Sequence, residues 1–173
     1  MKVSLCVLLL SVALAFTGQS RATTLPDACG KDAVNYEVTT HEGPAPPAAP
    51  AEGKAQVVLL ENENQMIGPF MHATVRFGID GTWVGATKGS SYFWTDVAPG
   101  IHHLCASWQS SLHQTKKNVD LTSFTAEPGK VYYFSAHVTV ASQYSVLFGL
   151  SQLNPDQGKY RVGISKLAKS KPK

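Results

Sequence analysis

The side chains best suited to chemistry in this chain are histidines and cysteines near its middle. His103 and Cys105 would share one strand face, and His72 and His113 could approach from loops, which together could hold a metal ion. The sequence has no Cys-x-x-Cys, His-x-x-x-His or His-Glu-x-x-His pattern, however, and structural zinc needs four ligands at recognisable spacing. His102 points the other way and is expected to be a hydrogen-bonded core imidazole. We therefore expect no metal and no cofactor, and rank metal binding through His103 and Cys105 last among the possible functions.

Catalysis lacks its usual signatures. The chain has no Gly-x-Ser-x-Gly elbow for a nucleophilic serine and no glycine-rich phosphate loop. Its carboxylates are few, and Asp80 and Glu127 fall in turn sequences, where they hold backbone groups rather than act as an acid and base pair. We expect no catalytic residues and interpret the protein as a non-enzyme.

One group of side chains is the best candidate for a binding surface. In the predicted strands it points away from the apolar face and consists of Arg76, Trp83, Tyr92 and Trp94. Flat aromatic faces on a sheet stack against sugar rings or partner side chains, and a guanidinium can stack on an indole. The preferred interpretation is nevertheless that an N-terminal segment or a second sheet covers these rings as ordinary core.

The N-terminus has the features of a secretory signal peptide. Lys2 precedes an apolar run from Val3 to Phe16, and Ser20-Arg21-Ala22 places small residues at the third and first positions before a cut. The apolar run is shorter than the ~20 residues of a membrane-spanning helix, which makes a membrane anchor the lesser alternative. No cysteine is placed for lipid attachment. We expect removal of residues 1–22 and export, to the periplasm or the cell exterior, of a soluble monomer without stable membrane insertion.

Export would place the two remaining cysteines, Cys29 and Cys105, in an oxidising compartment. An even count there favours a disulfide over free or metal-bound thiols. Cys105 points outward in the predicted register. The bridge would therefore hold the N-terminal piece across the outer face of the sheet.

Charge argues against nucleic acid as a partner. The formal net charge is +3, and loss of Lys2 and Arg21 with the signal peptide leaves 13 basic and 12 acidic residues. A nearly neutral chain has no general affinity for a polyanion. The remaining basic bias lies near the C-terminus. No acid follows Asp156, and the basic residues after it could touch an anionic envelope polymer: Lys159, Arg161, Lys166, Lys169, Lys171 and Lys173. They are interpreted instead as solvated, with residues 167–173 as a frayed basic tail.

A proline- and alanine-rich segment, residues 41–53, divides the mature chain and favours an extended, semi-rigid spacer. Residues 23–40 before it alternate apolar and polar side chains and could add one strand. Residues 54–166 form the main domain. Its first strand, Val57–Leu60, is continuously apolar, which is typical of a strand covered on both faces.

Turn signals at regular spacing predict an antiparallel meander from Thr74 to Val138. Asp80-Gly81, Ala98-Pro99-Gly100 and Glu127-Pro128-Gly129-Lys130 each separate short runs of alternating apolar and polar residues. The first of these would be a two-residue type I′ turn. It predicts a register in which Phe77 faces Val84 with the apolar side chains inward.

The C-terminal part predicts the longest strand, a return strand over Tyr144–Leu153 and one helix. Asn154 is a good N-cap and Pro155 suits the first helical position. Seven or eight strands with a short C-terminal helix are typical of an all-β fold. We predict an antiparallel β-sandwich, immunoglobulin-like or transthyretin-like, with a partly open barrel as the alternative.

Several short motifs of the main domain carry a resemblance: Ile79-Asp80-Gly81, Val84-Gly85, Tyr92-Phe93, Pro99-Gly100-Ile101-His102, Pro128-Gly129-Lys130-Val131-Tyr132-Tyr133 and Gly158-Lys159-Tyr160. In these the chain resembles the family called domain of unknown function 2846, over about Lys54 to Arg161. That family comprises small bacterial envelope proteins, many apparently lipoproteins, with no established activity. The same turns are similar to the surface repeat named after its Pro-Glu-Gly-Ala motif, a non-catalytic sandwich. The resemblance implies a fold and an envelope location, although this chain lacks the acylated cysteine.

Three hypotheses for the function follow. The first is a non-catalytic exported envelope protein that acts as a structural or interaction module, with an unknown envelope protein or glycan as its partner. The second is a carbohydrate- or peptide-binding module that uses the aromatic sheet face. The third is the metal-binding protein described above.

Overall fold

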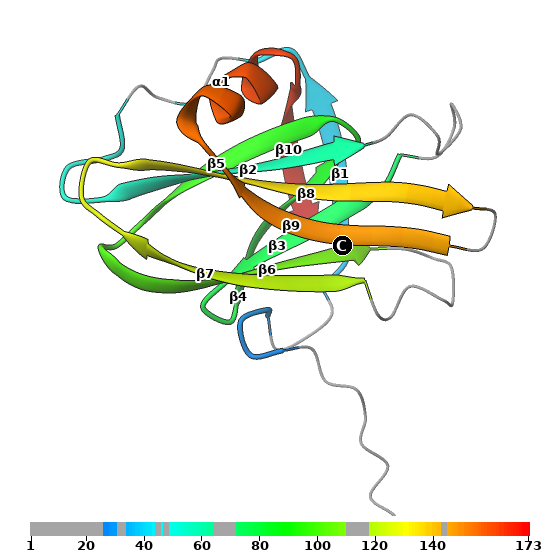
Figure 1. Cartoon of the computed structure of the whole chain (residues 1–173), viewed down its shortest axis with the longest axis horizontal. Coiled ribbons are helices and arrows are strands. Elements are labelled where there is room, and N and C mark those ends of the chain that lie inside the picture. Colours follow the sequence, from blue (N-terminus) through cyan, green and yellow to red (C-terminus); the bar gives the residue numbers. More distant parts are fainter. Residues whose placement is uncertain are drawn as a thin grey trace, which may run out of the picture.

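Two β-sheets stacked face to face make up most of the protein, as the computed structural model shows (Figure 1). The structure describes residues 26–30, 34–43, 46, 49–63, 72–109, 118–142 and 145–173. The larger sheet has six strands in the order β1 (Tyr36–His41), β10 (Lys166–Pro172), β5 (Ser91–Val97), β2 (Ala55–Glu63), β8 (Val131–Ser142) and β9 (Ser145–Leu153). The smaller sheet has four, in the order β4 (Thr82–Lys88), β3 (Thr74–Ile79), β6 (Gly100–Gln109) and β7 (Val119–Ala126). One helix, α1 (Pro155–Gly163), follows β9.

The all-β sandwich with a short C-terminal helix is confirmed, but the prediction that it is antiparallel is wrong for the larger sheet, where β2 pairs in parallel with β8 and β10 in parallel with β5. The described residues contain ten strands, where seven or eight were expected. The predicted signal peptide, residues 1–22, lies outside the described residues, as does part of the spacer over residues 41–53. No helix within the described ranges is long and apolar enough to cross a membrane.

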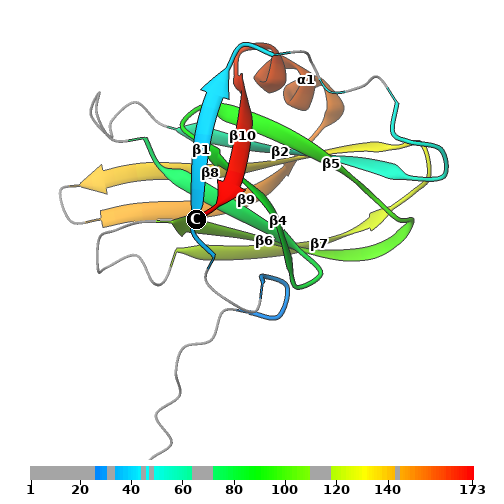
Figure 2. The ribbon, with the colours of Figure 1, turned by 180° about the vertical axis from the view of Figure 1, so that it is seen from behind.

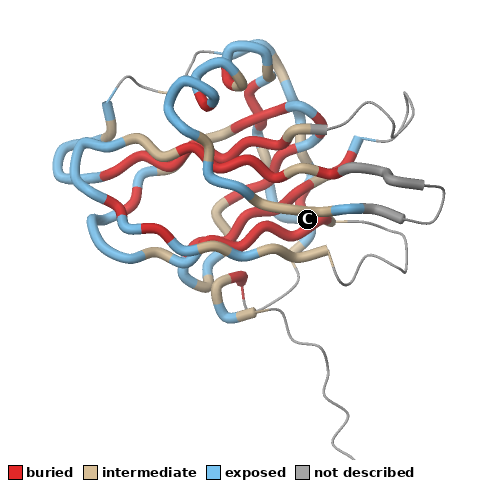
Figure 3. The backbone as a smooth tube through the Cα atoms, viewed as in Figure 1, coloured by how far each residue is buried: buried red, intermediate tan, exposed pale blue. Residues whose placement is uncertain are grey.

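The main core lies between the two sheets. The inward side chains of β2, β3, β6, β7 and β8 are buried there, and Figure 3 shows these stretches as buried on the facing strands. A second cluster lies on the other side of the six-stranded sheet, beneath α1, and consists of Val58, Leu60, Tyr92, Tyr133, Val162 and Leu167. β2 is therefore covered on both faces, as its continuous apolar run predicted.

The Asp80-Gly81 hairpin forms, but its register differs from the prediction. The two residues have φ angles of 51° and 79°, as a type I′ turn requires. A bulge at Val84 then pairs Phe77 with Gly85, so the predicted pairing of Phe77 with Val84 is wrong, and every later pair moves by one residue. Gly85 is needed beside the bulge because a Cβ on it would lie 2.9 Å from the ring of Phe93 of β5, which packs against the main core.

The prediction of one continuous meander is wrong at two places. β5 does not pair with β4 but crosses to the six-stranded sheet, where its neighbours are β2 and β10. The turn at residues 98–100 leads back to the four-stranded sheet, and the turn at residues 127–130 leads from β7 across to β8. Tight-turn sequences look alike whether the strands they join pair in one sheet or pass between two, so the turn signals could not distinguish these topologies.

The C-terminal residues form a strand rather than the frayed tail expected for residues 167–173. β10 pairs with β1 along its length and in parallel with the start of β5 (Figure 2). Leu167 and Ala168 are buried while the neighbouring lysines point to solvent. The Ser170 hydroxyl accepts a hydrogen bond of 3.0 Å from the backbone N–H of Ala86 in β4. The ribbon of β1 and β10 therefore links the two sheets on this side.

The helix begins where the sequence predicted. The Asn154 side chain accepts from the backbone N–H of Gln157 at 2.9 Å, and the Gln157 side chain reaches back to the backbone N–H of Asn154, which makes a capping box. Gly158 weakens the helix by its own propensity, but a Cβ there would overlap the ring of Tyr133. The glycine therefore lets α1 lie close against β8.

Candidate functional site

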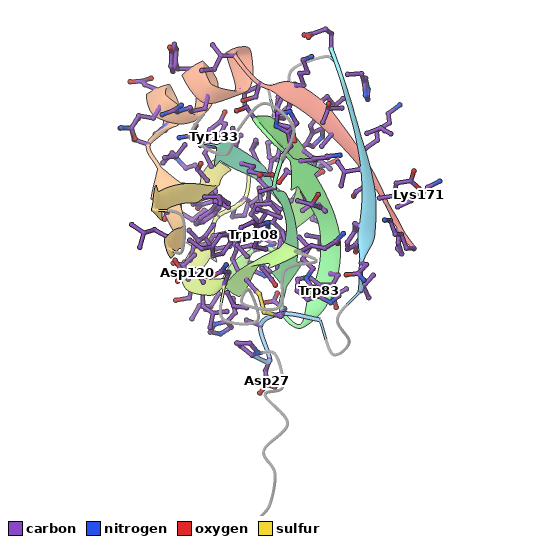
Figure 4. The ribbon with its side chains drawn as sticks, turned by 90° about the vertical axis from the view of Figure 1, so that its right-hand side faces the viewer. Asp27, Trp83, Trp108, Asp120, Tyr133 and Lys171 are labelled. Atoms are coloured by element: carbon purple, nitrogen blue, oxygen red, sulfur yellow. A yellow bond between two sulfur atoms is a disulfide. The ribbon has the colours of Figure 1, made fainter. Side chains whose placement is uncertain are left out.

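A short N-terminal segment crosses the outer face of the four-stranded sheet. Cys29 is bonded to Cys105 of β6, with Cα atoms 5.1 Å apart, as predicted; Figure 4 shows the bond in yellow. Both residues are buried. Gly78 of β3 makes room for the segment, because a Cβ there would lie 3.1 Å from the Cα of Cys29. We call residues 26–30 and 34–36 the N-terminal cover.

Beneath the N-terminal cover, Arg76 is held by neutral groups. Its Nη1 donates to the backbone oxygen of Val34 at 2.8 Å, and Nε and Nη2 both approach the Ser107 hydroxyl at 3.3 Å. The guanidinium carbon lies 4.9 Å from the centre of the Trp83 ring, so the predicted stack is present. Burial lowers the pKa of Arg76, an effect that the Tyr36 hydroxyl partly opposes. Arg76 thus fastens the N-terminal cover from below.

The four residues predicted as a binding face do not form one surface. Trp83 lies on β4 beside Arg76, and the backbone of Gly30 packs so closely on its indole that a Cβ would overlap the ring. Tyr92 and Trp94 lie on β5 in the other sheet, stacked 6.3 Å apart in the cluster beneath α1. Tyr92 is buried. The predicted common face assumed that β4 and β5 were neighbours, and the observed topology separates them.

A histidine–aspartate pair connects the β3–β4 turn to the turn before β6. His102 Nδ1 lies 2.6 Å from Asp80 Oδ2, His102 Nε2 lies 2.7 Å from the backbone oxygen of Ala98, and Asp80 Oδ1 accepts from the backbone N–H of His103 at 2.8 Å. Both imidazole nitrogens face acceptors, so the protonated ring can donate to both.

The electrostatics of this pair agree with its geometry. Burial acts to lower the pKa of His102, but the bonds to Ala98 and Asp80 outweigh it and raise that pKa. Burial likewise acts to raise the pKa of Asp80, and the hydrogen bonds from His103 and His102 hold it below its usual value. Both ring nitrogens are held by acceptors of the chain itself, so the pair holds the β3–β4 turn and the turn before β6 together.

The residues considered for a metal site are not brought together. The sulfur of Cys105 is in the disulfide and has no thiolate to offer, while His103 is exposed on the outer face of β6. His72 is exposed before β3, and His113 lies outside the described residues. Within the part of the chain that the structure describes, no three histidine, cysteine or acidic side chains are placed to hold a metal ion.

The part of the outer face formed by β6 and β7 is more exposed than the part beneath the N-terminal cover. Ile101 of β6 and Leu121 of β7 are 71% and 46% exposed, and His103 and Ser123 lie opposite each other between them. We call Ile101, His103, Leu121, Ser123 and Thr125, all exposed, the β6–β7 face. Sequence reasoning missed it, although the signal was there. Both aliphatic residues fall on the side of the strand pattern that otherwise carries polar residues.

Comparisons of this chain with protein-family models, with curated proteins and with solved structures find no match. The resemblance to the two envelope families stays a prediction.

Proposed function

We propose that this protein is an exported, non-catalytic interaction module of the bacterial envelope that binds a partner protein through the β6–β7 face. The observation that carries the proposal is that one part of the outer face of the four-stranded sheet is covered while the part beside it is exposed. A disulfide and the Arg76 contacts fasten the N-terminal cover over β3 and part of β4, whereas Ile101 and Leu121 beside it stay exposed. We take Ile101 and Leu121, which are exposed on the same sheet face, as the apolar part of a surface that contacts a partner.

The disulfide supports export. A buried bridge such as Cys29–Cys105 persists in oxidising compartments and is rare in the cytosol. The signal-peptide features of residues 1–22 point the same way. Both the periplasm and the cell exterior provide such a setting.

The chemistry of the β6–β7 face fits a protein better than a sugar. Sugar-binding surfaces stack aromatic rings such as those of Trp and Tyr on the sugar, and the large exposed apolar side chains of this face are the aliphatic Ile101 and Leu121. The hydroxyls of Ser123 and Thr125 supply the polar groups that rim a protein interface. The aromatic residues that would favour the carbohydrate alternative lie on separate sheets.

Photo-crosslinking in the producing cell tests the proposal. A photoreactive amino acid at position 121 should give one discrete adduct with another protein, because Leu121 would lie in the interface. The same amino acid at position 39, in place of the exposed Thr39 of β1, should give none. Equal adducts at both positions, or an adduct at position 121 that contains only a second copy of this chain, would contradict the proposal.

A further inference from the structure

A small polar hollow lies beside the C-terminal end of α1, where the helix meets β2 and β8. Its volume is about 60 Å³, and its lining includes Leu60, Asn62, Ser135, Arg161 and Ile164. A water molecule in the liquid occupies ~30 Å³, so the hollow would take only a few non-hydrogen atoms. It lies on the α1 side of the six-stranded sheet, away from the β6–β7 face of the other sheet.

Arg161 supplies a positive charge to this hollow. Its Nη1 donates to Asn62 Oδ1 at 3.1 Å, which holds the half-buried guanidinium at the hollow. Among the described residues, no carboxylate forms an ion pair with it. A guanidinium carries five N–H donors in a planar fork. One bond to an amide oxygen therefore leaves donors for a ligand.

Ser135 supplies a hydroxyl. The residue is 5% exposed, and its hydroxyl donates to the backbone oxygen of Ala136 at 3.5 Å, which is the outer limit for a hydrogen bond. Buried hydroxyls in folded proteins normally have better partners. An anion in the hollow would give this hydroxyl a stronger acceptor than it has now.

We propose that this hollow binds the carboxylate of a small organic acid. A carboxylate accepts two parallel hydrogen bonds from a guanidinium, and Ile164, which is 58% exposed, gives a short alkyl group an apolar wall. The Glu61 side chain points between the two sheets, where its Oε2 accepts from the Thr87 hydroxyl of β4 at 2.8 Å. The planar guanidinium fork and the apolar wall favour an organic carboxylate over phosphate, which has no alkyl group to place against Ile164.

A titration of the mature protein followed by amide NMR tests this proposal. The probes are propionate, a short peptide with a free C-terminal carboxylate, and phosphate, at matched ionic strength. Propionate or the peptide should shift the amides of Asn62, Ser135 and Ser165 and saturate in the millimolar range, and the tighter of the two identifies the natural source of the carboxylate.

Two charge variants test whether binding depends on Arg161 itself or only on the positive charge of α1. Arg161→Gln should weaken propionate binding by at least about tenfold, because the bidentate contact is lost. Lys159→Gln removes the same charge from an exposed position of α1 and should leave the affinity unchanged. Ser135→Val keeps Arg161 and fills the hollow with methyl groups, so it should abolish saturable binding. Shifts that do not saturate, phosphate binding as tight as that of propionate, or equal affinities for the two charge variants would overturn the proposal.

Discussion

Replacing both bridged cysteines by alanine should lower the free energy of unfolding substantially. The bridge between Cys29 and Cys105 spans 76 residues of sequence. A cross-link over a loop of that length removes about 4.5 kcal/mol of chain entropy from the unfolded state at 25 °C. The N-terminal cover would keep its hydrogen bond from Arg76 and the two hydrogen bonds between the backbone of Tyr36 and the Gln109 side chain. The loss should therefore arise in the unfolded state rather than from a collapse of the native sheet.

Urea unfolding and thermal melts measure this effect. For a domain of this size, about 2–4 °C of melting temperature correspond to 1 kcal/mol, so the double variant should melt about 9–18 °C lower than the oxidised protein. A reducing agent should lower the wild-type midpoint by a similar amount and leave the double variant unchanged. A wild-type midpoint that does not respond to reduction, or a variant that loses less than about 1 kcal/mol, would refute the reasoning.

Three other perturbations have defined outcomes. Gly81→Val should destabilise the protein by at least ~1 kcal/mol in thermal melts, because φ is 79° there and a Cβ would lie 2.8 Å from the backbone oxygen of Asp27. An NMR titration should give His102 a pKa above 6.5, and Asp80→Asn should lower it. Because the folded pKa of His102 is raised, the stability that His102 contributes is complete below pH 6.5 and is lost as the pH rises through this folded pKa. Because the folded pKa of Asp80 is lowered, the stability that Asp80 contributes is lost as the pH falls through the folded pKa of Asp80. Gly158→Ala should destabilise the protein in urea, although alanine favours a helix by about 1 kcal/mol, since the new Cβ would overlap a tyrosine ring of β8.

Matched variants serve as controls for these predictions. Thr82→Val, on an exposed strand position beside the turn, should be nearly neutral, and a melt equal to that of Gly81→Val would mean that the turn is misplaced. Gly163→Ala adds a Cβ with nothing within 4 Å and should not destabilise; if Gly158→Ala is equally harmless, α1 does not rest on β8 as closely as described. If Asp80→Asn leaves the pKa of His102 unchanged, Asp80 does not hold the imidazole as described.

Features that depend on a few neighbouring residues could be predicted from the sequence. Asp80-Gly81 and the Asn154 cap act through their own backbone angles and hydrogen bonds, and both formed where expected. The disulfide was predictable for another reason. Only two cysteines remain after the proposed signal peptide, so the pairing had one solution.

Features that depend on distant segments could not be predicted in this way. β10 reads as a basic tail because its lysines face solvent, and only its pairing with β1 makes it a strand. Beside the bulge at Val84, the Phe93 ring of β5 lies within 2.9 Å of where a Cβ of Gly85 would be, a contact between distant segments that no local pattern encodes. The hollow beside Arg161 draws its lining from β2, β8 and the end of α1, so its residues are far apart in the sequence.

Side-chain oxidation by hydroxyl radicals, compared between the purified protein and the intact envelope, decides whether the β6–β7 face is occupied in the cell. Ile101 and Leu121 should react readily in the purified protein and be protected in the envelope. Leu147 of β9, which is 59% exposed on the other sheet, should react equally in both and serves as the control. Equal reactivity of Ile101 and Leu121 in the two samples would contradict the proposed interaction surface.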